Sequence, residues 1–268
     1  MRYMAATTTV MISMFLLLAG CQGLAQGDRG KGSPCDRSES YYRLAVGALQ
    51  EGEMVRARQE LFHAEELCPG NERVHNLAGL LDLQENKYDQ AIARFTRALE
   101  IDPKYSDARH NMANVYMAKQ DWPKARDLLL VVAEDMLYNY PYLVERNLGF
   151  VYYQLNEKEK AKEHLKKAVF IEDSMCRAWF DLGVIAREEG EREKALRYFE
   201  NAVRPNKKAP NKSCDRFVKG YYELAVLYLE FHEQDKARES LKRCADLTQN
   251  VPDATMHVEC AKMLRMFE

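Results

Sequence analysis

The sequence predicts an all-α fold, a right-handed superhelix of six helix–turn–helix repeats that ends in a C-terminal capping helix. The first observation is an alanine that recurs about every 34 residues and follows a polar turn each time. The second is a small residue twelve positions before each alanine, and the third is another small residue seven positions after it. Self-similarity at a fixed period of this length is the signature of stacked helical hairpins. The recurring alanines are Ala57, Ala91, Ala125, Ala161, Ala195 and Ala237.

Small residues at these places let the two helices of one hairpin approach closely, while a larger side chain four residues after each alanine fills the space between hairpins. The small residues before the alanines are Ala45, Gly79, Ala113, Gly149, Gly183 and Ala225. Those after them are Ala64, Ala98, Val132, Ala168, Ala202 and Cys244. The larger residues are Leu61, Phe95, Leu129, Leu165, Phe199 and Leu241.

Residues 1–20 have the layout of a signal peptide that precedes the repeats. Arg2 is followed by an apolar stretch that is diluted by threonine and serine and falls short of the roughly 20 residues needed to cross a bilayer. The stretch ends on small residues before Cys21, as export signals do. Residues 21–37 are rich in glycine and polar residues and are expected to form a flexible tether.

The six repeats are expected to span residues 38–250, with two interruptions of the period. The phase slips by two residues across AEDMLYNYPYLVERNLG, which indicates either an altered second helix in the third repeat or an extended loop. It slips by eight residues across RPNKKAPNKSCDR, which predicts a solvated loop. The amphipathic residues 251–268 are expected to cap the last repeat, as terminal repeats must.

Six cysteines remain besides Cys21, an even number that is compatible with disulfides in an exported protein. An antiparallel hairpin places the start of its first helix beside the end of its second. Cys35, just before the first helix, should therefore be a neighbour of Cys68. Cys176 and Cys214 both precede first helices of adjacent hairpins, and Cys244 faces the capping helix that carries Cys260. We favour these three pairs, while a Cys214–Cys244 bridge and free buried thiols stay open for the last four cysteines.

The sequence contains no recognisable catalytic or metal-binding motif. Its histidines lack metal-ligand spacing, its cysteines form no C-x-x-C pair, and it has neither a Gly-rich phosphate loop nor a G-x-S-x-G elbow. A formal net charge of −2 gives no basic excess for nucleic acid. We therefore expect no enzymatic activity, no metal or cofactor, no small-molecule substrate and no nucleic-acid partner, but a surface that binds protein.

The fifth repeat, CRAWFDLGVIAREEGEREKALRYFENAV, resembles the tetratricopeptide repeat in nearly all of its characteristic positions. This resemblance implies a concave groove lined by positions 2, 5, 9 and 12 of each first helix. Position 5 is occupied by Tyr42, Asn76, His110, Arg146, Phe180 and Tyr222. Position 9 is occupied by Val46, Leu80, Asn114, Phe150, Val184 and Val226, and position 12 by Tyr153 and Arg187 among others. Such residues suit a protein-binding groove, although the alternative is that several pack against neighbouring first helices.

Leu18-Ala19-Gly20-Cys21 resembles the lipobox of bacterial lipoproteins. The resemblance implies that Cys21 is acylated and becomes the first residue of the mature chain. The alternative is an ordinary signal peptide with a chance cysteine. Gln22 stands where an aspartate would resemble the inner-membrane retention signal, which favours the periplasmic face of the outer membrane.

A lipobox followed by six such repeats resembles the type IV pilus pilotin lipoproteins, the family of PilF, PilW and Tgl. The interruption after the third repeat is similar to the family's break through Glu134, Asp135, Tyr138, Asn147 and Gly149. The extra cysteines and the long loop before the sixth repeat depart from the shorter members, and the Tgl-like branch fits best.

The pilotin resemblance implies an outer-membrane lipoprotein that binds secretin subunits and promotes assembly and stability of the type IV pilus secretin channel. Pilus extension and twitching or social motility would then depend on it. The alternative function is a scaffold lipoprotein for peptidoglycan enzymes or polysaccharide export.

Overall fold

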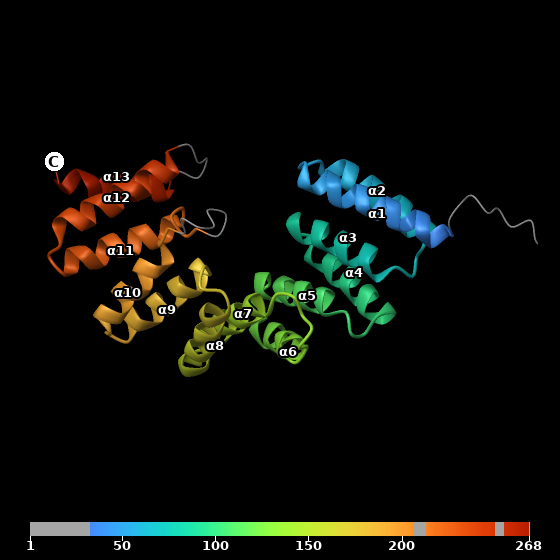
Figure 1. Ribbon diagram of the computed structural model, residues 1–268, viewed down its shortest axis with the longest axis horizontal. Coiled ribbons are helices and arrows are strands. Elements are labelled where there is room, and N and C mark those ends of the chain that lie inside the picture. The colour runs from blue at the N-terminus through green and yellow to red at the C-terminus, as the bar shows by residue number, and fades with distance from the viewer. Residues whose placement is uncertain (1–32, 206–212, 250–254, 268) are drawn as a thin grey trace, which may run out of the picture. The chain divides into compact units, whose positions relative to one another are not determined.

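The computed structural model describes residues 33–205, 213–249 and 255–267, and every regular element in these ranges is a helix (Figure 1). This confirms the predicted all-α class. The predicted signal peptide, Cys21 and most of the predicted tether lie outside the described residues. The chain divides into two compact units, Met1–Val74 and His75–Glu268.

In the first unit, α1 (Pro34–Gln50) and α2 (Met54–Leu67) form an antiparallel hairpin. Helix α1 begins four residues before the predicted start of the repeats, inside the segment assigned to the tether. The reason is a capping box: the Ser33 hydroxyl accepts from the Asp36 amide (3.1 Å), and the Asp36 carboxylate accepts from the Ser33 amide (2.7 Å). Pro34 occupies the first helical position, where a missing N–H costs nothing.

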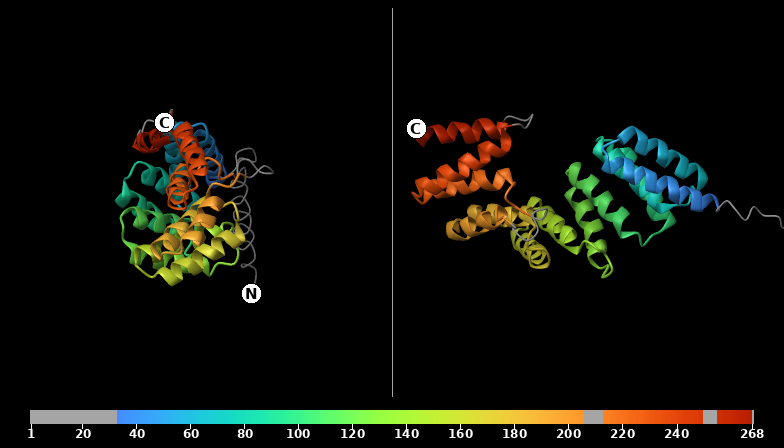
Figure 2. Two further views of the ribbon diagram at one scale, coloured as in Figure 1. Left: turned by 90° about the vertical axis from the view of Figure 1, so that its left-hand side faces the viewer. Right: turned by 45° about the horizontal axis from the view of Figure 1, so that its top comes forward.

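Helix α3 (Glu72–Gln84) begins at the end of the first unit and continues into the second. The second unit then repeats the hairpin several times, and Figure 2 shows its hairpins stacked in chain order. Its further helices are α4 (Tyr88–Ile101), α5 (Ser106–Ala118), α6 (Trp122–Ala133), α7 (Pro141–Gln154), α8 (Lys158–Ile171), α9 (Cys176–Glu188), α10 (Arg192–Ala202), α11 (Val218–Glu230), α12 (Gln234–Thr248), α13 (Thr255–Leu264) and the 3-10 helix η2 (Arg265–Phe267).

Each first helix is followed, two residues after its end, by a residue with a left-handed backbone, at position 15 of its repeat. This conformation stops the helix and turns the chain toward the second helix. Two of these residues are glycines, which adopt it without steric cost. The set is Gly52, Asn86, Gln120, Asn156, Gly190 and His232, with φ between 59° and 80°. Successive members are 34 residues apart except for intervals of 36 and 42 residues, which confirms the predicted slips of two and eight.

The core consists of the small residues that define the period and the larger residues packed on them. All six recurring alanines are fully buried, as are Phe95, Leu129, Leu165, Phe199 and Leu241. Where the small residue is glycine, the facing side chain occupies the place of the missing Cβ atom. A Cβ atom added at Gly149 would lie 2.5 Å from Cγ of Leu165, and one at Gly183 would lie 2.6 Å from Cε1 of Phe199.

The first interruption combines the two alternatives that the sequence left open. Helix α6 has 12 residues, whereas α4 and α8 have 14, so the second helix of the third repeat is shortened. An extended connection, residues 134–140, then leads into α7, which begins at Pro141. The second interruption follows α10, and its central residues 206–212 lie outside the described part of the chain.

Among the described residues three disulfides are formed, and they are the three pairs that the helix register favours. Their Cα atoms are 5.0 Å apart for Cys35–Cys68, 5.4 Å for Cys176–Cys214 and 6.1 Å for Cys244–Cys260. Cys35 lies in the first turn of α1 and not before it, because the capping box starts this helix earlier than predicted. Cys176 is the first residue of α9, so the second bridge ties α9 to the segment that precedes α11.

At the C-terminal end, α13 packs against α12 and continues into η2. Leu241, Cys244 and Cys260 are fully buried there. The partly buried residues packed around them include Tyr221, Tyr222, Met263 and Phe267. Within residues 255–267, the segment therefore covers the apolar face of the last hairpin, as expected of a cap.

Candidate protein-binding surface

The predicted groove residues of the second unit lie on its first helices. In Figure 1, α5 and α7 lie on the inner side of the bend formed by this unit, and α6 and α8 lie on its outer side. We call positions 5, 6, 9 and 12 of these first helices the inner row. Their side chains make contacts from one first helix to the next. These contacts determine which side chains of the row a partner can reach.

The first contact joins the second and third repeats. Asn111 donates from Nδ2 to Oδ1 of Asn76 (3.0 Å), and Asn76 donates from its own Nδ2 to the Tyr105 hydroxyl (3.3 Å). Asn76 is thereby buried with both ends of its amide bonded. Position 5 of one repeat is thus linked to position 6 of the next.

The second contact has the same geometry and includes a buried histidine. Nδ2 of Asn147 lies 3.0 Å from Nε2 of His110 and donates to Oδ1 of Asn114 (3.0 Å). The other ring nitrogen, Nδ1 of His110, lies 2.7 Å from the Tyr138 hydroxyl. If Asn147 donates to Nε2, the ring proton resides on Nδ1 and is donated to Tyr138. Burial lowers the pKa of His110 to about 4, so this ring is neutral near pH 7.

The third contact is an ion pair between Arg146 and Asp181, with a closest N–O distance of 3.0 Å. Both side chains are largely buried, with exposed fractions of 15% and 17%. Loss of solvation raises the pKa of Asp181, an effect that the nearby Arg146 opposes. The guanidinium carbon of Arg146 also lies 5.2 Å from the ring centre of Phe150, a cation–π distance.

The pattern changes between the fifth and sixth repeats because position 5 is the apolar Phe180. Its ring centre lies 5.3 Å from that of Phe217 and 5.5 Å from that of Phe199. A polar link is made farther along the helix, where Arg187 forms an ion pair with Glu223. Tyr153 similarly donates its hydroxyl to Glu188 of the next repeat.

For Asn76 and His110, these contacts favour the alternative that the sequence left open, in which groove residues pack against neighbouring first helices. Asn76 and His110 are buried and bonded within the chain, so they hold successive repeats together and expose little to a partner. The sequence reasoning missed their partners because it considered position 5 without position 6. The signal was present, since each polar residue at position 5 from the second to the fourth repeat faces a polar residue 35 or 37 positions later.

The other inner-row residues remain candidates for contact with a partner. Position 9 carries partly buried apolar side chains in four repeats of the second unit, two of which, Leu80 and Val184, pack against core clusters. The four are Leu80, Phe150, Val184 and Val226. Tyr222 packs against the capping cluster. In the first unit, Tyr42 and Val46 are half-buried, and the guanidinium of Arg73 lies 4.3 Å from the ring centre of Tyr42.

Two side chains of the connection between α6 and α7 bind it to α5. Asp135 accepts a hydrogen bond from Ser106 Oγ (2.6 Å) and another from the backbone amide of Leu137 (3.0 Å). Tyr138 packs against the core and reaches His110 through its hydroxyl. Between these two anchors, Met136 and Leu137 point into solvent, with exposed fractions of 97% and 89%.

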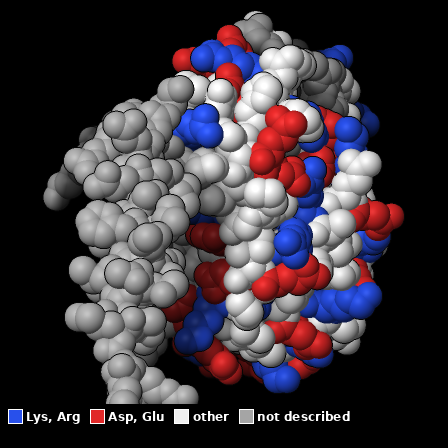
Figure 3. Space-filling view, turned by 90° about the vertical axis from the view of Figure 1, so that its right-hand side faces the viewer, with Lys and Arg blue, Asp and Glu red and all other residues white. Residues whose placement is uncertain are grey.

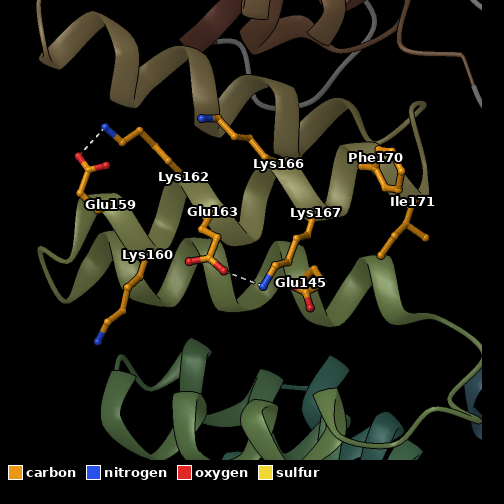
Figure 4. Close-up of a pocket in the computed structure, with 9 residues that line it drawn as sticks. All are labelled: Glu145, Glu159, Lys160, Lys162, Glu163, Lys166, Lys167, Phe170 and Ile171. Carbon is orange, nitrogen blue, oxygen red and sulfur yellow. Dashed lines mark ion pairs between the residues drawn. The ribbon is translucent and has the colours of Figure 1, made fainter.

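A hollow of about 770 Å³ lies over the exposed face of α8 (Figure 4). All of its lining residues belong to α8 except Glu145 of α7. Phe170 and Ile171 lie at one end of the hollow, and charged side chains lie along the rest. The lining residues are Glu145, Glu159, Lys160, Lys162, Glu163, Lys166, Lys167, Phe170 and Ile171.

The described residues contain no group of three or more histidine, cysteine, aspartate or glutamate side chains that could hold a metal ion. Within the same ranges, no helix has the length and apolar character needed to cross a membrane. On the face drawn in Figure 3, lysine and arginine alternate with aspartate and glutamate in the part that is not grey. That face carries no large area of a single charge.

Comparison with known proteins identifies the repeats directly. Three family profiles, each described as tetratricopeptide repeat, match residues 82–136, residues 147–172 and 218–251, and residues 178–211. Together they cover more than half of the chain. These profiles describe a repeat and not an enzyme.

The type IV pilus assembly protein PilF of Pseudomonas aeruginosa is 24% identical over 193 residues, which make up 70% of this chain and 76% of PilF. The solved structure of Pseudomonas aeruginosa PilF has a TM-score of 0.71 at 20% identity and covers 86% of this chain and 99% of its own. The crystal structure of PilW, described as a widely conserved type IV pilus biogenesis factor, has a TM-score of 0.69 at 16% identity, covering 84% and 98%. The chain therefore belongs to the tetratricopeptide repeat proteins and is a homologue of PilF.

Proposed function

We propose that this protein is a biogenesis factor of the type IV pilus that acts by binding another protein. The observation that carries the proposal is its homology to PilF along most of both chains, together with a matching fold that spans nearly all of the solved PilF structure. A stack of helical hairpins offers extended surfaces for a partner. Its contribution would be to hold a partner in place.

The finer proposal is that the partner is the secretin and that the protein is a pilotin. It would bind secretin subunits and promote their assembly into the stable outer-membrane channel through which the pilus passes. A groove or surface on the repeats would receive a segment of the secretin while the surface that inserts into the membrane is still uncovered. Pilus extension and twitching or social motility would depend on this step.

We further propose that the protein is anchored to the periplasmic face of the outer membrane through acylated Cys21. The lipobox-like residues 18–21 and Gln22 support this placement. Two or more acyl chains give stable anchoring, whereas a single chain binds only marginally. The anchor would concentrate the repeats at the membrane in which the channel forms.

The test is deletion of the gene, followed by electrophoresis of membranes heated in detergent and immunoblotting for the secretin. We expect heat-resistant secretin multimers to be lost while the monomer is still made, and re-expression of the wild-type gene to restore them. Normal multimers in the deletion strain would contradict the pilotin role. Recovery of a peptidoglycan enzyme or a polysaccharide exporter with the purified protein, without the secretin, would favour the scaffold alternative.

A further inference from the structure

We propose, on the basis of the function proposed above, that the secretin docks on the fourth repeat and the connection that precedes it, and not on the inner row. This repeat-four surface consists of Met136, Leu137, Tyr140, Phe170 and Ile171, together with the hollow over α8. The occupant that fits it is an amphipathic segment of the secretin, with apolar side chains for the exposed residues and carboxylates for the lysines beside them.

Exposure is the first argument. Met136 and Leu137 are 97% and 89% exposed, Phe170 is 91% exposed, and Tyr140 and Ile171 are about half exposed. Scattered apolar residues are normal on a protein surface, but several large ones at one place mark an interaction site. The inner row, by contrast, binds most of its polar side chains to one another.

Phe170 and Ile171 lie at one end of the α7–α8 hairpin, and the connection that carries the other three residues leads into that end. Helices α7 and α8 have 14 residues each and pack against each other, so the last residues of α8 lie beside the first residues of α7. Figure 4 shows Phe170 and Ile171 at the end of α8 where the chain enters α7. Met136, Leu137 and Tyr140 belong to the connection that leads directly into that same end.

Side-chain hydrogen bonds hold the connection on both sides of the exposed pair. Asp135 is bonded to Ser106 and to the Leu137 amide, and Tyr138 is bonded to His110, on either side of the exposed pair. The rings of Tyr138 and Tyr140 lie edge to face with centres 6.0 Å apart. A preorganised apolar pair binds more tightly than a flexible one because less conformational entropy is lost.

Charge defines the rest of the occupant. Of the four lysines that line the hollow, Lys160, Lys162 and Lys167 form ion pairs with glutamates. Lys166 forms no ion pair with any residue that the structure describes. The pKa of Glu191 is lowered mainly by Lys194, and the charge of Lys166 adds to this shift, so Lys166 also interacts with that carboxylate over a longer distance. A carboxylate on the incoming segment would pair with Lys166.

The test is the affinity of the purified, oxidised mature protein for detergent-solubilised secretin. The double variant Met136→Asp/Leu137→Asp and the single variant Phe170→Asp each remove exposed apolar contacts. We expect each to bind at least about tenfold more weakly, as when an apolar anchor is lost from an interface.

Lys166→Glu should weaken binding and reduce its salt dependence. Met266→Asp, a change at another exposed apolar residue of the second unit, is the matched control and should bind as wild type.

The outcomes separate this inference from the proposed function. If the wild-type protein does not bind the secretin, the pilotin role itself fails. If it binds and the three surface variants bind equally well, only the docking site is wrong. The altered side chains are exposed, so each variant should keep the wild-type circular dichroism and melting temperature. A photo-cross-linker at Leu137 in living cells should capture the secretin, whereas capture of lipid or of another protein would overturn the assignment.

Discussion

Glycine at position 8 is the point of closest approach within the fourth hairpin. A methyl group on Gly149 would overlap Leu165 and lie 3.2 Å from the backbone oxygen of Ala161, so α7 and α8 would have to separate. Overpacking of this kind typically costs about 1–3 kcal/mol. Gly149→Ala should therefore lower the free energy of unfolding measured with urea by that amount.

Gly47 provides the opposite case in α1. No atom lies within 4 Å of a Cβ placed there, and alanine is the better helix former by about 0.5–1 kcal/mol. Gly47→Ala should raise the stability of the first unit slightly. Equal effects of the two substitutions would show that a methyl group at Gly149 fits without separating α7 and α8.

His110 makes the stability of the second unit depend on pH. Its pKa is about 4 in the folded protein and close to 6.5 in an unfolded chain, because burial disfavours the imidazolium. Above pH 6.5 both states are neutral, and below it the unfolded state takes up a proton that the folded state does not. Stability is therefore lost as the pH falls from 6.5 to 4, by about 3 kcal/mol over the whole interval.

The measurement is urea unfolding at several pH values for the wild type and for His110→Gln. The variant lacks the titrating ring, so its stability should fall less steeply over this interval even if it is less stable at pH 7. Parallel pH profiles would show that His110 is not protonated on unfolding. Comparing the two slopes removes the contribution of the carboxylates, which both proteins share.

Among the elements, the disulfide between Cys176 and Cys214 compensates for the interrupted period before α11. It closes a loop with a sequence separation of 38 residues, whereas Cys244–Cys260 closes one of 16. In the chain-entropy model, these bridges stabilise the fold by about 4 and about 3 kcal/mol. Replacing Cys176 and Cys214 together by serine should therefore cost more stability in urea than replacing Cys244 and Cys260. The reverse order would indicate that the longer bridge strains the folded state.

The helices themselves were largely predictable, because the alanine period fixes their phase. All six recurring alanines are buried, and even the two slips appear as longer intervals between the turns. The start of α1 was misplaced because composition favours a tether there, while the capping box formed by Ser33 and Asp36 depends on two individual residues. The period of the repeat does not predict local hydrogen bonds of this kind.

The candidate surface was less predictable than the helices. The phase correctly places Asn76, His110 and Arg146 on one side of their helices, but it cannot say whether a polar side chain there meets solvent or a neighbour. The connection that displays Met136 and Leu137 breaks the repeat pattern, so no repeat position describes it. Its exposure follows from anchors at Ser106 and His110, which lie about 30 residues earlier in the chain.

At the scale of the whole molecule, the proposed anchor makes a prediction that does not depend on the repeats. Cys21→Ser should abolish incorporation of labelled palmitate and release the protein from the membrane fraction, because no acyl chain would remain. Gln22→Asp should shift the acylated protein to the inner-membrane fraction in a sucrose gradient. Outer-membrane recovery of unlabelled Cys21→Ser would show that another part of the protein holds it there.

The links between first helices also distinguish one junction between repeats from the next. Asn76 meets Asn111, His110 meets Asn147, and Arg146 meets Asp181, so each junction has a different chemistry. If a hairpin docked out of sequence, Arg146 would be buried without its carboxylate, which is far more costly than a mismatched amide. The repeats have similar backbones, but the side chains at each junction favour one particular pair of neighbouring repeats. An alignment of relatives should accordingly show paired substitutions about one repeat apart.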